Sequence, residues 1–512
     1  MELISIIPDF HPLNDENLLK KAEKIRPEIR YSDLIPPQSC QINGKDISLE
    51  ALSCLPLRRG DQAVLDFGEH LVGRLTLDLD AAGSHQDAPA YLQIDLAEIK
   101  DELNEQAERY QGWLSSSWIQ QERMHLDTLP ARVELPRRYA FRYVRVTVLD
   151  TSPKYQLLLQ SAKGRAESAA DWSRVPPRDI RDQELKRIYD VSLKTLADCT
   201  QLVMEDGPKR DRRLWLGDLR LQALVSYISF RSLDVIRRCL YLFAGTRFPD
   251  GRMSANVFTD PEPAADDTYL MDYALMYPIV LEEYLRETND QEALEDLFEP
   301  ALAQTDSVLS RCLDPDGVLT EASAKESFID WSDTLNRTAA VQGVLICSLD
   351  AAAALCGRKG ADDRRQECLR QAQRLRQAAE KRFWRPEEGC FSDGGQIAIH
   401  TQVWLTLADI MPKEAAEGAF EKALSLPDAP RMKTPYMHHY YVAALLKAGL
   451  KEKAQAHLRA YWGGMLKAGA DTFWECYDPD DPLGSPYGGR IVNSFCHAWS
   501  CTPAYLIDRY FR

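Results

Sequence analysis

The hydrophobic pattern of this chain changes its period once, near residue 170. Up to about residue 165 apolar and polar residues alternate, as in QAVLDFGEHLVGRLTLDLDA and ARVELPRRYAFRYVRVTVLD, which is typical of strands with one buried face. After the paired prolines of SRVPPRD, residues 173–179, apolar residues recur at helical spacing. We therefore predict an N-terminal β-sandwich over residues 1–170 and a helical domain over residues 171–512.

The helical half divides into about twelve segments. They begin near Ile180, Gly217, Leu233, Asp267, Glu292, Arg337, Asp362, Thr401, Lys413, Pro435, Leu450 and Asn493. Helices in short hairpins can build an open α-solenoid or a closed (α/α)6 barrel. Because solenoids usually show a repeat of fixed length and none is visible here, we favour the closed barrel.

Unusual polar and aromatic residues gather in the loops before the even-numbered helices. These loops are DGPKRDRRLWLGD, DGRMSANVFTDPEPAADD, SFIDWSDTLNR, GGQIAIHTQVW, MKTPYMHHYY and GADTFWECYDPDDPLGSPYGGRIVNSFCH. Alternate helices of such a barrel form its inner ring, so these six loops should meet at one rim. We expect a single pocket there, lined by carboxylates and aromatic rings, which is the usual form of a small-molecule site.

A pocket of this composition suits sugar hydrolysis. Aromatic faces pack on sugar rings, charged groups bind hydroxyls, and two carboxyl groups can act as acid and base across the scissile bond. The densest stretch is MEDGPKRDRRLWLGD, residues 204–218, where Asp211 lies among four basic residues. Taken alone, this stretch also fits a helix N-terminus with Asp218 in its first turn and surface ion pairs around it.

Several segments of the chain are similar, in order, to one enzyme family. DGPKRDRRLWLGD resembles the catalytic signature of the α-L-rhamnosidases, glycoside hydrolase family 78, which reads approximately D-x-P-x-R/Y-E-x-x-x-W-x-G-D. DFGEHLVGRLTL and YAFRYVRV resemble its N-terminal sandwich, DYALMYPIVLEEYLRETND and FIDWSD its mid-barrel, and DTFWECYD with NSFCHAW its closing loop and last inner helix. The resemblance runs from about residue 60 to the end. It implies an inverting exo-glycosidase with a β-sandwich before an (α/α)6 barrel.

The resemblance also implies roles for individual residues. Asp211 falls on the general acid and Glu475 on the general base that activates water. The implied sugar contacts are Asp206, Arg210, Trp215, Asp218, Asp330, Trp331, Trp474 and His497. The alternative interpretation is that Trp215 and Trp474 are core residues and that His497 is a buried core histidine. Weaker candidates for the pocket are His400, Gln402, His438 and His439.

Two features depart from the family pattern. Asp211 stands where the family has Glu, whose side chain is one methylene longer. Three explanations stay open: the substrate lies closer to Asp211, another acid protonates the leaving group, or the activity differs. The chain also ends at YLIDRYFR, where many relatives continue into a further β-sandwich. Two alternatives stay open: the same fold acting on a different glycone, and a non-catalytic carbohydrate-binding protein.

Amino-acid composition restricts the classes of molecule that the protein is expected to bind. The 62 basic and 78 acidic residues give a net charge of −16, which disfavours nucleic acids and anionic membranes. We expect a small glycoside or oligosaccharide as the partner, with no cofactor and no metal, and a homodimer is compatible with these features. The start, MELISIIPDFHPLNDENLLKK, lacks the pattern of a secretory signal, and the 12 cysteines are scattered, so we expect a cytoplasmic protein with free thiols.

Overall fold

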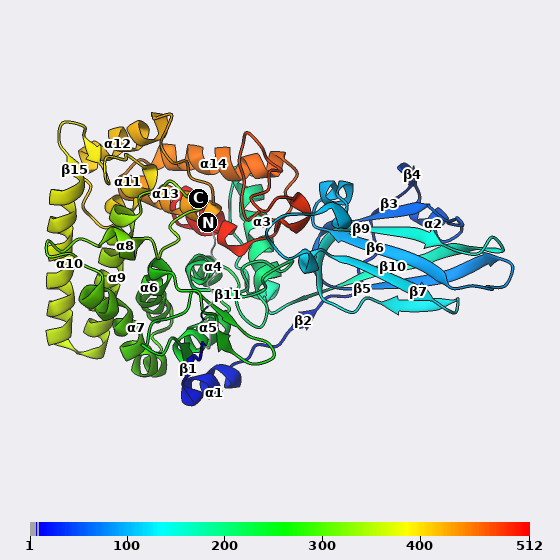
Figure 1. Ribbon diagram of the computed structural model, residues 1–512, viewed down its shortest axis with the longest axis horizontal. Coiled ribbons are helices and arrows are strands. Elements are labelled where there is room, and N and C mark those ends of the chain that lie inside the picture. The colour runs from blue at the N-terminus through cyan, green and yellow to red at the C-terminus, as the bar shows by residue number, and fades with distance from the viewer. Residues whose placement is uncertain (1–6, 8–9) are drawn as a thin grey trace.

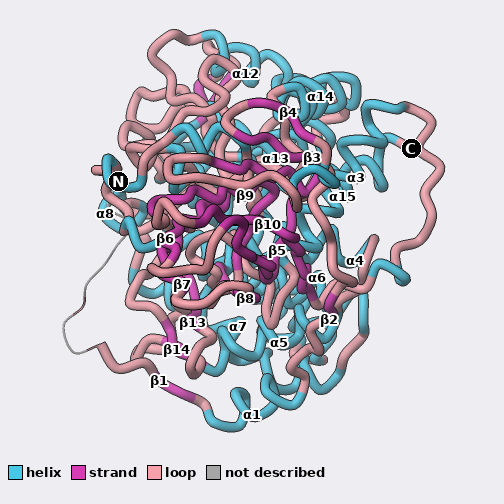
Figure 2. The backbone as a smooth tube through the Cα atoms, turned by 90° about the vertical axis from the view of Figure 1, so that its right-hand side faces the viewer, coloured by secondary structure: helices cyan, strands magenta, loops and turns pink. Residues whose placement is uncertain are grey.

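The protein consists of a β-rich domain followed by a helical domain, as the change of period predicts. The computed structural model describes residue 7 and residues 10–512. Figure 1 shows the β-rich domain at one end of the molecule and the helices gathered at the other. Figure 2 views the molecule from the side of the β-rich domain, with its strands in front of the helices.

One long strand, β5 (Gln62–Gly83), organises the β-rich domain. Its first half pairs with β3 (Ser39–Ile42) and β9 (Tyr139–Asp150), and its second half pairs with β8 (Ala131–Glu134) and β10 (Tyr155–Ser168). The remaining strands are β2 (Arg30–Tyr31), β4 (Lys45–Ile47), β6 (Ala90–Ala97) and β7 (Gln121–Leu126), and all pairs are antiparallel. Alternate residues of β5, such as Leu75, Leu77 and Leu79, point into the domain's own apolar core.

Residues 13–24 pack on the helical domain. Strand β1 (Leu13–Asn14) pairs with β12 (Thr246–Arg247), and α1 (Glu16–Lys24) lies against α5 (Leu233–Gly245). Arg238 of α5 donates a hydrogen bond to the Ala22 carbonyl oxygen at 2.5 Å. The structure thus corrects the N-terminal domain predicted over residues 1–170, because Leu18 and Ala22 are buried with the core of the helical domain.

The helices form two concentric rings. The inner ring consists of α4 (Leu216–Ile228), α6 (Met271–Thr288), α9 (Thr338–Lys359), α11 (Ile399–Leu407), α13 (Pro435–Lys447) and the last segment, made of η6 (Ala498–Ser500), α15 (Pro503–Leu506) and η7 (Ile507–Phe511). The outer ring consists of α3 (Gln183–Cys199), α5, α7 (Gln291–Arg311), α10 (Asp362–Phe383), α12 (Lys413–Ser425) and α14 (Lys451–Lys467). Neighbouring inner elements touch in turn until η6 meets α4, and α14 meets α3. The twelve observed helical segments begin within a few residues of the predicted starts.

Helix α9 illustrates the pattern of an inner helix. Among the described residues it is the one helix long and apolar enough to cross a membrane, and 78% of its most apolar window is buried inside the protein. An inner helix is covered on all sides, so it is apolar all round, whereas outer helices such as α10 keep a polar face. The composition of α9 is therefore that of a core helix.

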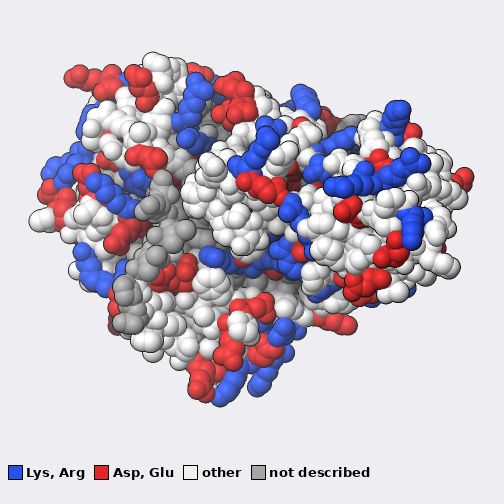
Figure 3. Space-filling model, turned by 45° about the vertical axis from the view of Figure 1, so that its right-hand side comes forward, with Lys and Arg blue, Asp and Glu red and all other residues white. Residues whose placement is uncertain are grey.

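The surface carries charges of both signs. Figure 3 shows acidic and basic side chains interspersed over one face of the molecule.

The expectation of free thiols is confirmed, because all 12 cysteines are unpaired.

Close packing between inner helices makes Gly343 of α9 sensitive to substitution. A Cβ atom added there would lie 2.7 Å from the Trp404 carbonyl oxygen of α11. We expect Gly343→Ala to lower stability by about 1–3 kcal/mol, since overpacking forces backbone shifts. Gly357, exposed on the same helix, is the matched control: its Cβ would meet only the Arg365 side chain, at 3.7 Å, so Gly357→Ala should be neutral or stabilising. Midpoints of thermal unfolding measure both, and equal shifts would contradict this packing argument.

Candidate active site

A cavity of about 640 Å³ lies where the inner-ring loops meet the β-rich domain. Its lining comes from the loops before α4, α6, α9, α13 and η6, and from residues 113–118 of the β-rich domain. The prediction that inner-ring loops share one rim therefore holds for five of the six loops. Among the described residues, the loop before α11 contributes no lining side chain.

Two buried aspartates lie on the acid loop, residues 204–215, and on the helix α4 that follows it. Asp206 accepts a hydrogen bond from the Arg213 backbone N–H at 3.0 Å, and Asp218 lies in the first turn of α4. Burial raises the pKa of Asp206 well above its ordinary value, and the neighbouring carboxyls of Asp211 and Asp218 add to the shift. Burial likewise raises the pKa of Asp218, with a further contribution from Glu475. Both groups therefore retain a proton to unusually high pH.

Asp211 projects into the cavity from a left-handed turn. Its φ is +59° and that of Arg212 is +52°, a region that residues other than glycine seldom occupy. The Arg212 N–H donates to the Arg210 carbonyl oxygen at 2.7 Å, and the Arg212 side chain donates to the carbonyl oxygens of Pro208 at 2.9 Å and Arg138 at 2.8 Å. These contacts hold a conformation that costs free energy, and such outliers concentrate at functional sites. The Asp211 side chain is 20% exposed and lines the cavity.

Glu475 arrives from the closing loop, far away in sequence. Its buried carboxylate accepts from Arg210 Nη2 and, at 2.5 Å, from the Tyr487 hydroxyl. The other terminal nitrogen of the same guanidinium, Nη1, lies 3.9 Å from Asp211 Oδ2. Arg210 thus brings the two predicted catalytic carboxyls next to one cation.

His497 lies among the carboxyls. Its ring nitrogens are 3.7 Å from Asp218 Oδ1 and 3.9 Å from both Asp206 Oδ2 and Glu475 Oε1. Burial, together with the Arg210 cation, lowers the pKa of His497 well below its ordinary value, so the imidazole is neutral at pH 7. Trp215 Nε1, Asp218 Oδ1 and His497 Nδ1 are buried and have no hydrogen-bond partner in the described part of the chain. All three residues line the cavity, where a hydroxylated ligand can satisfy them.

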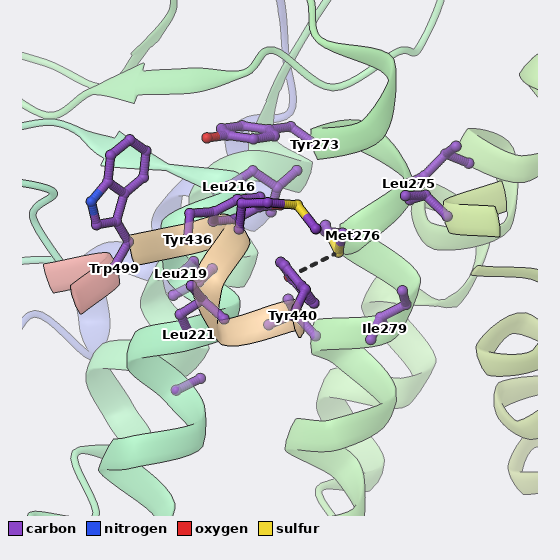
Figure 4. Close-up of a cluster of buried hydrophobic side chains, with 14 of the residues drawn as sticks. Leu216, Leu219, Leu221, Tyr273, Leu275, Met276, Ile279, Tyr436, Tyr440 and Trp499 are labelled. Carbon is purple, nitrogen blue, oxygen red and sulfur yellow. Dashed lines mark hydrogen bonds between the residues drawn. The ribbon is translucent and has the colours of Figure 1, made fainter. Parts of the chain in front are cut away.

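Aromatic rings complete the cavity. The predicted wall residues Trp215 and Trp331 line it, together with Tyr273, Phe328 and Trp499. The Trp499 ring stacks on Phe328 at 5.9 Å, and Trp331 packs edge-on against Trp499 at 5.8 Å. Figure 4 shows Tyr273, Tyr436 and Trp499 in one cluster with further apolar side chains of α4, α6 and α13, in which the Tyr440 hydroxyl donates to Met276 Sδ. The wall is therefore continuous with the barrel core.

Two predicted sugar contacts do not line the cavity. Trp474 is fully buried and packs edge-on against Phe495 at 5.2 Å, so the structure makes it a core residue. Asp330 is also fully buried, and its carboxylate accepts from His400 at 3.0 Å, the Lys433 N–H at 2.8 Å and Thr434 at 2.8 Å. A fourth hydrogen bond, accepted from the Trp331 N–H at 2.9 Å, fills the acceptor sites of the carboxylate. Asp330 therefore ties the loops before α9 and α13 to α11 and does not face a ligand.

The weaker candidates also lie elsewhere. Gln402 bonds both backbone groups of Phe391, and His438 bonds His457 at 2.7 Å. Among the described residues, none of His400, Gln402, His438 and His439 lines the cavity.

Sequence reasoning missed Tyr487 and the wall from residues 113–118. Tyr487 lies in the quoted closing loop, but no local pattern shows that its hydroxyl reaches Glu475. Trp113 and Trp118 lie in the β-rich half, where hydrophobic alternation reports only on the sheet. Their place in the cavity depends on how the two domains dock.

Carboxyl groups gathered in a cavity lined by aromatic rings are the arrangement that a glycoside hydrolase needs. The family model described as bacterial alpha-L-rhamnosidase 6 hairpin glycosidase domain matches residues 180–511. The glycosyl hydrolase family 78 alpha-rhamnosidase N-terminal domain matches residues 37–166. The chain therefore belongs to glycoside hydrolase family 78, the α-L-rhamnosidases.

Solved structures agree with this membership. A rhamnosidase from Klebsiella oxytoca with rhamnose bound is 42% identical, with a TM-score of 0.93 over 98% of this chain and 99% of that one. A family 78 rhamnosidase from Bacillus sp. GL1 is 20% identical, with a TM-score of 0.75 over 91% of this chain and 49% of the other. The α-L-rhamnosidase of Streptomyces avermitilis, complexed with L-rhamnose, is 16% identical, with a TM-score of 0.68 over 94% and 44%. The last two share the fold, and the comparison with curated proteins finds no match.

The raised pKa of Asp218 predicts how the free energy of unfolding changes with pH. A buried carboxyl with a raised pKa favours folding fully below the usual Asp pKa of about 4, and this contribution is lost as the pH rises through the raised value. Asp218→Asn should therefore be nearly neutral at pH 4 and stabilising by about 1–3 kcal/mol at pH 7, while it weakens sugar binding. Thermal unfolding at both pH values measures this.

Asp234→Asn, at an exposed position in the first turn of α5, serves as the control and should show no such pH-dependent gain. A loss of stability in Asp218→Asn at pH 7 would contradict the argument.

Proposed function

We propose that the protein hydrolyses terminal α-L-rhamnosyl residues by single displacement with inversion. Asp211 gives its proton to the leaving oxygen as the glycosidic bond breaks, and Glu475 takes a proton from the water that attacks the anomeric carbon. The products are free rhamnose of inverted configuration and the alcohol. Proton exchange with solvent restores both carboxyl groups.

The observation that carries this proposal is the meeting of Asp211 and Glu475 at the two terminal nitrogens of Arg210. These carboxyls come from opposite ends of the helical domain and line one cavity. An inverting site keeps its carboxyls about 6.5–9.5 Å apart to leave room for water, and one guanidinium between two carboxyls is a spacer of suitable size. The rhamnose bound to the 42% identical rhamnosidase supports the glycone.

The environment of Asp211 suits an acid with a short side chain. Its left-handed backbone and the Arg212 contacts fix the carboxyl at the cavity wall, so loss of one methylene relative to Glu is offset by backbone position. Its partial exposure gives it access to solvent protons between turnovers. Asp211 is therefore able to protonate a leaving group that departs toward the mouth.

Glu475 is arranged as an acceptor. Arg210 and Tyr487 orient the carboxylate, and the Trp499 indole N–H donates to the Glu475 carbonyl oxygen at 2.9 Å, which fixes the backbone. A base held in one orientation loses less entropy on reaching the transition state. The neutral His497, with Asp206 and Asp218, is left to bind the sugar hydroxyls.

Leaving groups of different acidity separate the two catalytic roles. A 4-nitrophenolate leaves with little protonation, so Asp211→Asn should reduce kcat far less on 4-nitrophenyl α-L-rhamnoside than on methyl α-L-rhamnoside. Glu475→Gln removes water activation and should reduce kcat by a similar factor, about 10²–10⁴, on both. NMR of the first product formed by the wild-type protein should show the inverted anomer.

Asp478→Asn is the matched control, an exposed acid three residues after Glu475, and should retain activity. Net retention of configuration would exclude the mechanism, and unchanged turnover in Glu475→Gln would exclude the base. A panel of other 4-nitrophenyl glycosides tests the glycone: faster hydrolysis of another sugar would overturn the rhamnoside assignment.

A further inference from the structure

One side of the outer wall of the cavity is built by the β-rich domain. The segment between β6 and β7 contributes Trp113, Leu114, Ser115 and Trp118 to the lining. Trp113 is 52% exposed, whereas Asp206, Asp218 and Glu475 are almost fully buried. This difference in exposure gives the cavity a direction, with the carboxyls at its floor and Trp113 at its mouth.

The wall is held in place by the closing loop. The Trp113 indole N–H donates to the Pro486 carbonyl oxygen at 3.1 Å, and the Tyr110 hydroxyl donates to the Tyr487 carbonyl oxygen at 3.0 Å. The rings of Trp113 and Tyr487 are 5.4 Å apart. A Cβ atom at Gly112 would lie 1.8 Å from the Tyr487 carbonyl oxygen, so the two loops approach as closely as glycine allows. The Trp113 ring is therefore fixed before any ligand binds.

The chemistry of this wall differs from that of the floor. The floor offers carboxyls, a guanidinium and an imidazole, which match the hydroxyls of a sugar. The wall offers two indoles and a leucine, with the Ser115 hydroxyl as its polar side-chain group in addition to indole N–H groups. A half-exposed, fixed indole gains most from a flat apolar partner, because ring stacking adds to the area buried.

In an exo-acting enzyme the terminal sugar occupies the floor, so whatever is attached to it extends through the mouth. We propose that Trp113 and Trp118 form the leaving-group subsite and that this subsite selects planar aromatic aglycones over small alkyl ones. The proposal rests on the rhamnosidase activity proposed above and extends it to the class of substrate. It also makes the β-rich domain a determinant of specificity.

Benzyl and methyl α-L-rhamnoside test the subsite, because their leaving alcohols are of similar acidity and differ in the ring. We expect the wild-type protein to prefer the benzyl glycoside in kcat/KM. Trp113→Ala should lower kcat/KM about tenfold for the benzyl glycoside and less than twofold for the methyl glycoside. Inhibition by free L-rhamnose, which occupies only the floor, should be unchanged.

Two further variants separate stacking from structural damage. Trp113→Phe lacks the hydrogen bond to Pro486 but keeps a ring, so it should retain most of the benzyl preference. Trp172→Ala removes an equally exposed tryptophan, 52%, that packs edge-on against Phe230 instead of lining the cavity, and it should leave the benzyl-to-methyl ratio unchanged. Equal losses on both substrates in Trp113→Ala, or no loss on either, would overturn the subsite.

Calorimetric binding of both glycosides to Asp211→Asn, with and without Trp113→Ala, tests the subsite independently of turnover. If the wild-type protein turns over neither glycoside, the proposed function fails, and the ratio of the two Kd values still decides the subsite. A tighter Kd for the benzyl glycoside that disappears with Trp113→Ala supports it. Equal Kd values in Asp211→Asn contradict it.

Discussion

A buried ion pair between Lys209 and Glu102 fixes the acid loop to the β-rich domain. Both side chains are about 2% exposed, and Lys209 Nζ also donates to the Asn493 carbonyl oxygen at 2.9 Å. Removing one partner of such a pair would leave an uncompensated buried charge, which costs about 3–5 kcal/mol. Because Lys209 is two residues from Asp211, these contacts link Asp211 to both the closing loop and the β-rich domain. The rest of the site depends on this docking.

The buried carboxyl groups of the site lower the stability of the fold. Asp206 and Asp218 are buried near Asp211 and Glu475, and burial raises the pKa of the first two. Arg210 supplies one compensating cation, while His497 stays neutral because burial lowers its pKa. Such a cluster of carboxyls is tolerated because the apolar inner helices beneath it hold the loops at fixed positions. The cavity is thus pre-organised at the expense of stability.

The sequence predicts the elements better than their contacts. The change of hydrophobic period finds the β-rich and helical parts of the chain and the twelve barrel segments, because burial of one face is a local property of a strand or helix. It does not show that residues 13–24 pack with the helices, because that contact is made by tertiary packing. The family resemblance places Asp211 and Glu475 in one cavity. It does not distinguish Trp474, a core residue, from Trp499, a wall residue 25 positions later, because the direction of a ring depends on the fold of the closing loop. Asp330 is misjudged because its hydrogen-bond partners include residues of two segments far away in sequence, α11 and the loop before α13.

The dependence of the acid loop on another domain sets the smallest functional unit. His70 of β5 bonds Asp198 of α3 at 2.7 Å and Glu98 at 3.1 Å, and Glu98 accepts from the Phe495 N–H at 2.7 Å. The β-rich domain therefore supplies counter-ions beneath the catalytic loops as well as indoles at the mouth. A helical domain alone would keep Asp211 and Glu475 in its sequence, yet it would leave Lys209 without its carboxylate and the cavity without its outer wall. The catalytic unit is consequently the two-domain chain.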